Sequence, residues 1–231
     1  MARYVVRGTG AVGARAARQI FSGARTAEAT APPAATAATS ATSATSAATG
    51  APAPAVESMV VVGGRRSAEV VSALGPPASA AGWEEALAGG PAVVVLAHAG
   101  AHAEAATQAL EAGAHVVSVT DDEGDVRALL DLEEAASAKG LSVVVGAGFS
   151  PGLSCVLARH AAAWFEGIDE VRVASSGTGG PACARQHHRS LAARATEWQG
   201  GWSASPGGSG RELCWFPAPV GAADCYRAGL V

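Results

Sequence analysis

The sequence predicts a doubly wound parallel α/β sheet, followed by a smaller α+β region. Two patterns predict the sheet: short valine-rich runs alternate with helical patterns from residue 3 to residue 145, and a glycine turn joins the first run to the first helix. Of the 231 residues, 49% are hydrophobic and 16% are charged, which supplies ample material for a buried core. We assign the sheet to residues 1–150 and the second region to residues 151–231.

The first crossover carries a dinucleotide-binding pattern. A β-rich run at residues 4–6 meets the turn GTGAVG and then a helical pattern, which is the strand, G-x-G-x-x-G and helix order of such sites. Gly8 allows the sharp turn, Gly10 lets a pyrophosphate approach the backbone, and Gly13 lets the helix pack close to the strand. The amides that open the helix then point at the anion. The predicted cofactor contacts in this turn are Gly8, Thr9, Gly10, Ala11, Val12 and Gly13.

The helix after this turn is amphipathic. Val12, Ala16 and Ile20 recur every four residues, so we expect them to face the sheet. Arg15 and Arg18 fall between them and should face outward. The apolar stripe would then cover one face of the first strands.

Residues 29–56 contain only Ala, Thr, Ser, Pro, Gly and one Val, without a charge. Such a segment has too little apolar bulk to offset the entropy of ordering it, so we predict a low-complexity insertion. Cutting it out restores the usual interval between the glycine turn and the second strand. The insertion therefore belongs to the connection from the first helix to that strand.

The alternation of strands and helices continues to residue 150 and beyond. The predicted strands after the first are residues 58–62, 78–81, 92–96, 115–119 and 142–145. The predicted helices of the sheet region are residues 67–74, 83–87, a segment ending at 110, and 124–139. A further helix should follow, with Ser150 as its N-cap and Pro151 as its first residue, and should run to about residue 165.

The loop after the second strand favours NADP over NAD. An NAD site usually places an acid there to bind the ribose hydroxyl, whereas this chain has Gly-Gly followed by Arg65 and Arg66. Guanidinium groups suit multidentate recognition of a 2′-phosphate. The alternative is that both arginines are solvated loop charges.

Ligands of such sheets lie beyond the carboxyl ends of the strands, which nominates further residues. His98, between Ala97 and Ala99, would lie beside the nicotinamide as a cofactor contact or general acid, although it could instead cap the next helix. Asp121 and Asp122 could bind a cationic amine or serve as N-terminal caps. The glycine-rich loop 146–152 could lie against a flat ring, with Gly148 and Phe149 as contacts.

Residues 151–231 should supply a linking helix and part of a substrate domain. We expect a strand at residues 169–174, and then a polar segment in which Arg185 and Arg189 could clamp a substrate carboxylate and His187 or His188 could supply a proton. The alternative is a solvated helix. Trp198, Trp202, Trp215 and Phe216 suit strands of a sheet that packs on a substrate or on a second copy in a homodimer. The region is shorter than a complete substrate domain, so we expect a fragment of a longer enzyme.

Composition argues against several function classes. The net charge is −4 and no basic patch is interleaved with aromatic residues, which disfavours nucleic-acid binding. No apolar run reaches membrane-spanning length and no signal-like segment opens the chain, so we expect a cytoplasmic protein without membrane contact. The four cysteines form no C-x-x-C pair, which predicts free, mostly buried thiols and no metal site.

The glycine turn GTGAVG, the loop after the sixth strand and the stretch GAGFSPGLSCVLARHAA resemble saccharopine dehydrogenase-like oxidoreductases. Members of that family use NAD(P) to form or reduce a C–N bond in amino-acid or polyamine derivatives. The resemblance implies that Gly8, Gly10 and Gly13 bind the pyrophosphate, that Arg65 and Arg66 bind the adenosine end, and that Ala97, His98 and Ala99 line the nicotinamide side. The family's catalytic residues do not map onto this sequence, so none is carried over.

The sequence therefore predicts an NADP-dependent oxidoreductase that transfers a hydride to or from a carbon bonded to nitrogen in a small-molecule substrate. The alternative is a nucleotide-binding module without turnover. A methyltransferase would need an acid after the second strand, and the Gly-Gly-Arg sequence there argues against it.

Overall fold

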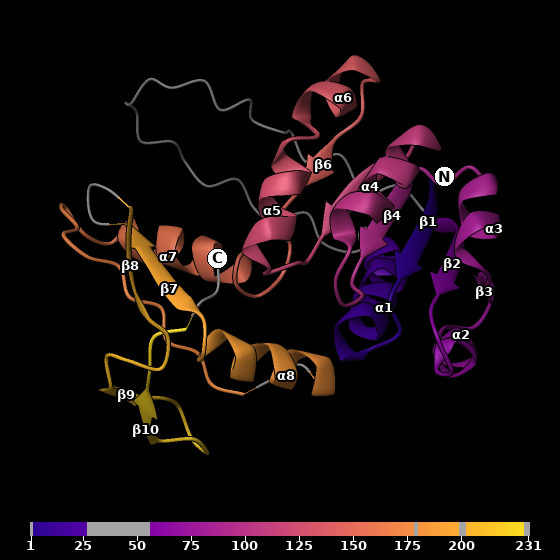
Figure 1. The fold of residues 1–231 in the computed structure, drawn as a ribbon. Coiled ribbons are helices and arrows are strands. Elements are labelled where there is room, and N and C mark those ends of the chain that lie inside the picture. The colour runs from indigo at the N-terminus through magenta and orange to yellow at the C-terminus, as the bar shows by residue number, and fades with distance from the viewer. Residues whose placement is uncertain (1, 27–55, 178–179, 199–201, 229–231) are drawn as a thin grey trace.

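The structure is a computed structural model that describes residues 2–26, 56–177, 180–198 and 202–228 (Figure 1). The insertion predicted over residues 29–56 lies outside the described residues, except for its last residue. In the sheet region the strands are β1 (Ala2–Arg7), β2 (Val56–Val62), β3 (Ala78–Ala80), β4 (Val93–Leu96), β5 (His115–Ser118) and β6 (Val143–Val144). The helices between them are α1 (Ala11–Thr26), α2 (Ser67–Leu74), α3 (Trp83–Ala88), α4 (His102–Glu111), α5 (Glu123–Leu130) and α6 (Glu133–Ala138).

These six strands form one parallel sheet in the order β3-β2-β1-β4-β5-β6, which confirms the predicted doubly wound fold. This is a Rossmann-like α/β architecture. The direction of winding reverses between β1 and β4, so the crevice of the sheet opens beyond the carboxyl ends of these two strands. The glycine turn follows the first of them and His98 follows the second.

Helices cover both faces of the sheet, and the core divides accordingly. Val6 on β1 and Val61 on β2 pack with α1 and α2, whereas Val5 on β1 and Leu96 on β4 pack with α4, α5 and α6. Successive residues of one strand thus enter opposite cores, because side chains alternate along a strand. A run of valines is buried on both sides, which is typical of a parallel sheet.

The face of α1 that meets the sheet matches the predicted one only in part, because Ile20 packs against the core as predicted but Val12 does not. Arg15 and Arg18 are exposed as predicted, but Val12 is 36% exposed, whereas Gly13 and Ala17 are buried. Gly13 packs on the backbone of the turn and fixes the rotation of the helix. The apolar pattern missed this face because two of its members carry little or no side chain.

The segment predicted as one helix over residues 124–139 forms two helices, α5 and α6. The amide of Leu132 donates to the carbonyl of Leu129, three residues back, and this tighter bond ends α5. Leu129 is buried and Leu132 packs against the same core. The break lets both leucines reach the sheet.

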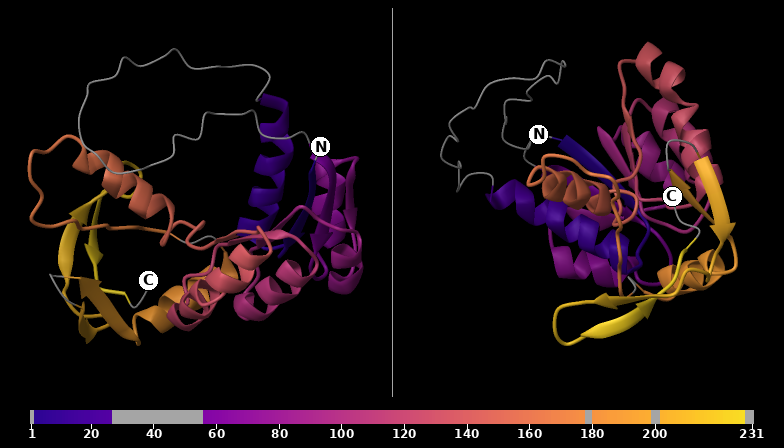
Figure 2. Two further views of the ribbon diagram at one scale, coloured as in Figure 1. Left: turned by 90° about the horizontal axis from the view of Figure 1, so that it is seen from above. Right: turned by 90° about the vertical axis from the view of Figure 1, so that its left-hand side faces the viewer.

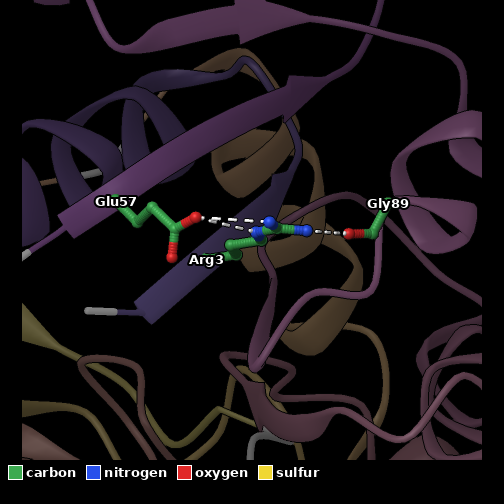
Figure 3. Close-up of polar contacts among 3 residues, drawn as sticks. All are labelled: Arg3, Glu57 and Gly89. Atoms are coloured by element: carbon green, nitrogen blue, oxygen red, sulfur yellow. Dashed lines mark hydrogen bonds and ion pairs between the residues drawn. The ribbon is translucent and has the colours of Figure 1, made fainter.

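Arg3 links three elements at the edge where β1 begins (Figure 3). Its guanidinium forms an ion pair of 3.2 Å with Glu57 on β2 and donates to the carbonyl of Gly89, after α3, at 2.9 Å. The contacts lie at the end of the sheet opposite to the glycine turn. They stabilise strand pairing without taking part in the crevice.

After the sheet come two helices and two small antiparallel sheets, on the other side of the molecule from β1 to β3 in the left view of Figure 2. β7 pairs with β8, and β9 pairs with β10. The predicted aromatic strands form, since three of the four tryptophans and phenylalanines named above lie in them. The elements are α7 (Leu153–Ala162), α8 (Pro181–Ser190), β7 (Arg194–Trp198), β8 (Trp202–Pro206), β9 (Glu212–Trp215) and β10 (Ala222–Cys225).

Two predictions for this region are wrong. The linking helix does not begin with Ser150 and Pro151: α7 starts at Leu153, and Gly152 is its N-cap residue. A compact turn precedes it, in which the amide of Gly148 donates to the carbonyl of Pro151. The strand predicted at residues 169–174 is not formed, because this segment finds no pairing partner in the described part of the chain.

An apolar groove of about 610 Å³ lies between α7 and residues 167–174. Leu157, Phe165 and Val171 line it, and each is more than half exposed. The alternating pattern of the predicted strand is present in this segment, yet its apolar side chains remain in solvent. Among the described residues, no helix is both long and apolar enough to cross a membrane.

Candidate dinucleotide site

The glycine turn has the geometry that its sequence predicts. Gly8 has a φ of +128°, and a Cβ there would overlap the backbone of Ala97. A Cβ on Gly13 would overlap the carbonyl of Gly8, so α1 packs directly on the turn. By contrast, no atom lies within 4 Å of the position of a Cβ on Gly10. Two glycines are therefore required by the fold, and the third leaves open space in front of the helix.

The open space lies at the start of α1. Gly10, Ala11 and Val12 are exposed, and the first turn of the helix contains no acidic residue. The amide of Ala14 donates to the carbonyl of Gly10, so the amides before it are the free donors of a helix N-terminus. These donors and the helix dipole suit an anion such as a pyrophosphate.

The loop after β2 lies beside this turn. A Cβ on Gly63 would overlap the side chain of Thr9, so the absence of a side chain at Gly63 lets the two loops pack together. Arg65 and Arg66 follow, both exposed. Arg66 pairs with Glu69 at 3.3 Å across one turn of α2, and both partners are more than 60% exposed. Such a pair is weak and leaves the guanidinium available to a stronger anion.

The loop after β4 lies on the other side of the turn. The amide of Ala97 donates to the carbonyl of Arg7 at 2.8 Å, and the exposed Ala99 follows His98. The ring of His98 stacks on His102 with centroids 4.5 Å apart and planes 19° apart. Both ring nitrogens are buried and have no hydrogen-bond partner in the part of the chain that the structure describes. Burial, helped by His102 and Arg7, lowers the pKa of His98 to about 4.

His102 belongs to a buried polar network that the sequence analysis missed. Its Nε2 donates to the carbonyl of His98 at 2.8 Å, so Nδ1 accepts from the Ser118 hydroxyl, also at 2.8 Å. Ser118 Oγ in turn accepts from the amide of Thr120. The network joins the loop after β4 to the end of β5, and the ring of His102 is 1% exposed. The signal available in the sequence was the change from valine to small polar residues at the end of β5.

Asp125 completes this network from α5. Its carboxylate accepts from the amides of His102 and Ala103 at 3.0 and 3.1 Å, and so caps α4 from another helix. The residue in the N-cap position, Ala101, has a φ of +54° and no polar side-chain atom that could accept a hydrogen bond. Asp125, and not His98, therefore caps α4. Because Asp125 lies 23 and 22 residues along the chain from the two amides that it caps, a local sequence pattern could not predict this role.

The two acids after β5 have separate roles. Asp122 is an ordinary cap, because its carboxylate accepts from the amide of Asp125 at 2.9 Å. Asp121 is about half-buried, and burial raises its pKa. A backbone hydrogen bond to the Asp121 carboxyl and, to a smaller extent, His187 on α8 oppose this rise in the pKa.

The polar segment predicted around residue 187 is helical, and α8 divides its polar residues between two faces. Arg185, His188 and Arg189 are exposed, whereas His187 is half-buried and lies on the same face as the buried Ser190. At its other end α8 approaches α1: a Cβ on Gly180 would lie 3.5 Å from that of Ala11. The helix therefore lies along the crevice side of the sheet with His187 turned inward.

The loop after β6 contributes less to the crevice than predicted. Gly148 packs on the end of β5, where a Cβ would lie 3.1 Å from the carbonyl of Val119. Phe149 is 54% exposed and lines the groove beside α7. Of the two predicted contacts, Gly148 thus lies at the carboxyl end of β5, whereas Phe149 lines the groove of the second region.

No known family model matches this chain. No curated protein matches it either. The residues that the structure describes contain no group of three or more histidines, cysteines and acids that could hold a metal ion. The assignment of a site therefore rests on the Rossmann-like sheet and on the glycine turn at its crevice.

Proposed function

We propose that this chain is an NADP-dependent oxidoreductase that transfers a hydride to or from a carbon bonded to nitrogen. The observation that carries the proposal is the open glycine turn at the switch point of a Rossmann-like sheet. Gly10, Ala11 and Val12 would hold the pyrophosphate through backbone amides. The loop after β4 would face the nicotinamide, which supplies the hydride chemistry when bound.

Arg65 and Arg66 support NADP as the cofactor. They stand where the 2′-phosphate of the adenosine end would lie, and Arg65 makes no hydrogen bond or ion pair within the described ranges. The one acid near them, Glu69, already pairs with Arg66 and lies on α2 rather than directly after β2. The ribose 2′-hydroxyl of NAD would therefore meet two cations and no dedicated acceptor.

The proton that accompanies the hydride would pass through Asp121 and His187. Burial raises the pKa of the Asp121 carboxyl, which favours its protonated form, and His187 on α8 is one of the ionisable groups that act on this carboxyl. His98 suits a different role. Its ring is neutral near pH 7, because its pKa is about 4, so it would position the loop rather than donate a proton.

The amino-acid or polyamine class of substrate rests on the resemblance to saccharopine dehydrogenase-like enzymes. Arg185 and Arg189, exposed one turn apart on α8, would bind a substrate carboxylate at the mouth of the crevice.

A comparative titration tests the cofactor. NADPH should bind more tightly than NADH, and replacing Arg65 and Arg66 together by alanine should remove roughly 1–3 kcal/mol of that preference. The matched control removes two exposed arginines on other elements, Arg159 and Arg211, and should leave the preference unchanged. Equal affinities of the wild-type chain for NADPH and NADH would contradict the assignment.

Turnover requires a separate measurement. The absorbance of NADPH is followed while imines and amino-acid derivatives are added to the chain. Consumption of NADPH supports the oxidoreductase. Binding without consumption across the panel would favour a nucleotide-binding module instead.

A further inference from the structure

The β9–β10 ribbon places two cysteines side by side. In its register Cys214 is opposite Ala223, and Cys225 lies two residues further along the same strand. Because side chains alternate across a strand, Cys214 and Cys225 project from the same face as diagonal neighbours. They and Ala223 are half-buried, whereas Leu213 on the other face is exposed. The two thiols therefore share the more protected face of the ribbon.

We propose that Cys214 and Cys225 are a redox-active dithiol that closes to a disulfide with a small-molecule disulfide as oxidant. Both are free thiols in the structure. The two groups also act on each other, since burial first and the Cys214 thiol next raise the pKa of Cys225. Cys155 lies on α7 and Cys183 lies on α8, so strand pairing places neither of them beside another cysteine.

The chemistry balances with glutathione disulfide as the oxidant. The thiolate of one cysteine attacks a sulfur of glutathione disulfide, which forms a mixed disulfide and releases one glutathione thiolate. The second cysteine then attacks the protein sulfur of that mixed disulfide and releases the second glutathione. The protein loses two electrons and two protons, and one glutathione disulfide is reduced to two glutathione molecules.

The geometry of the ribbon makes this bond reversible. Diagonal neighbours in a flat antiparallel ladder lie about 7–8 Å apart at Cα, whereas a disulfide usually spans about 4.4–6.8 Å. The strands must therefore twist toward each other, which a ribbon of two strands with no third strand bonded to it among the described residues allows. A bond that requires this movement is one that thiols reduce readily.

The acidic groups around Cys214 and Cys225 influence how fast these two thiols are oxidised. Glu212, opposite Cys225 in the register, and Asp224 both add to the raised pKa of the Cys225 thiol. Arg172 pairs with Glu212 at 2.7 Å and Arg211 pairs with Asp224 at 2.8 Å. Little Cys225 thiolate is present near neutral pH, so oxidation should accelerate as the pH rises toward the pKa of the thiol.

The test uses the full chain in buffers of graded glutathione and glutathione disulfide. After remaining thiols are alkylated, intact mass and peptide mapping identify the linkages. We expect two alkylated cysteines where the reduced chain has four, a peptide linking Cys214 to Cys225, and full reversal by dithiothreitol. Cys214→Ser should convert the product to a glutathione adduct on Cys225, whereas the control Cys155→Ser should still form the bond. Linkage through Cys155 or Cys183, or glutathione adducts alone on the wild-type chain, would overturn the proposal.

Discussion

The sheet of residues 2–148 and the region after it differ in where they place large apolar side chains. Met59, Leu96 and Leu129 are fully buried in the sheet region, whereas Trp164 and Trp215 in the second region are each 79% exposed. In the sheet, helices cover both faces of every central strand. In the second region, each ribbon has only two strands, and Leu153, Val156 and Leu157 on α7 are exposed. The same kind of apolar pattern therefore stabilises one region and stays in solvent in the other.

The largest expected difference between the regions is in the effect of truncating an apolar side chain. Leu129→Ala should lower the free energy of unfolding by about 2–5 kcal/mol, because it leaves a cavity in the core of the sheet. Trp164→Ala removes a larger side chain, but that side chain is mostly in solvent. This substitution should therefore change the free energy of unfolding by less than about 0.5 kcal/mol. Chemical denaturation of both variants measures the contrast. Equal losses would mean that Trp164 is buried in the protein in solution.

This contrast also explains how much of the structure the sequence could predict. Five of the six strands of the sheet, all except β3, follow from valine-rich runs that are typical of strands buried on both faces, whereas the order of the strands comes from the structure. Residues 169–174 carry an equally good strand pattern but form no strand, because a strand needs a partner that its own pattern does not supply. The start of α7 was misplaced for a related reason, since tertiary packing of the loop before it decides where the helix begins.

The site was predictable where function depends on local sequence. The separate roles of Gly8, Gly10 and Gly13 follow from their order in one turn, and the structure has the geometry of that turn. The cap that Asp125 provides to α4 was not predictable, because its partner amides lie 22 and 23 residues away in the chain.

A pH series sharpens the account of the buried network. The folded pKa of His98 is about 4, below its ordinary value of 6.5, so the unfolded chain binds a proton in this interval that the folded chain does not. The stability that neutral His98 provides is complete above pH 6.5 and is lost as the pH falls from 6.5 toward 4. A glutamine side chain takes up no proton in this range. The His98→Gln chain should therefore lose less stability than the wild type as the pH falls from 6.5 toward 4.

Denaturation of the wild-type and His98→Gln chains at several pH values measures this difference. Asp121 acts in the opposite direction, because its raised pKa favours the folded state at low pH, so it cannot produce the loss. Identical pH profiles for the two chains would show that His98 is not protected from protonation.

The smallest expected effect on stability is that of replacing Arg3, which lies near the exposed start of β1 (Figure 3). Arg3 and Glu57 are about half exposed, so Arg3→Ala should destabilise by less than about 1 kcal/mol. Glu57→Gln removes only the ion pair and keeps the bond from Arg3 to Gly89, so its effect should be smaller still. High salt should reduce the difference between the wild type and Glu57→Gln. A salt-independent loss above 2 kcal/mol, on the scale of a buried pair, would contradict this interpretation.

The central claim is that a phosphate-bearing cofactor lies against the start of α1, and the NADPH affinity of Gly10→Ala tests it most directly. The added methyl group meets no protein atom, so the free energy of unfolding should change by no more than about 1 kcal/mol. The same methyl would stand between the helix and the pyrophosphate, so NADPH should bind at least about tenfold more weakly, or about 1.4 kcal/mol. Calorimetric titration of both chains gives the answer. A stable Gly10→Ala chain that binds NADPH as tightly as the wild type would contradict the account.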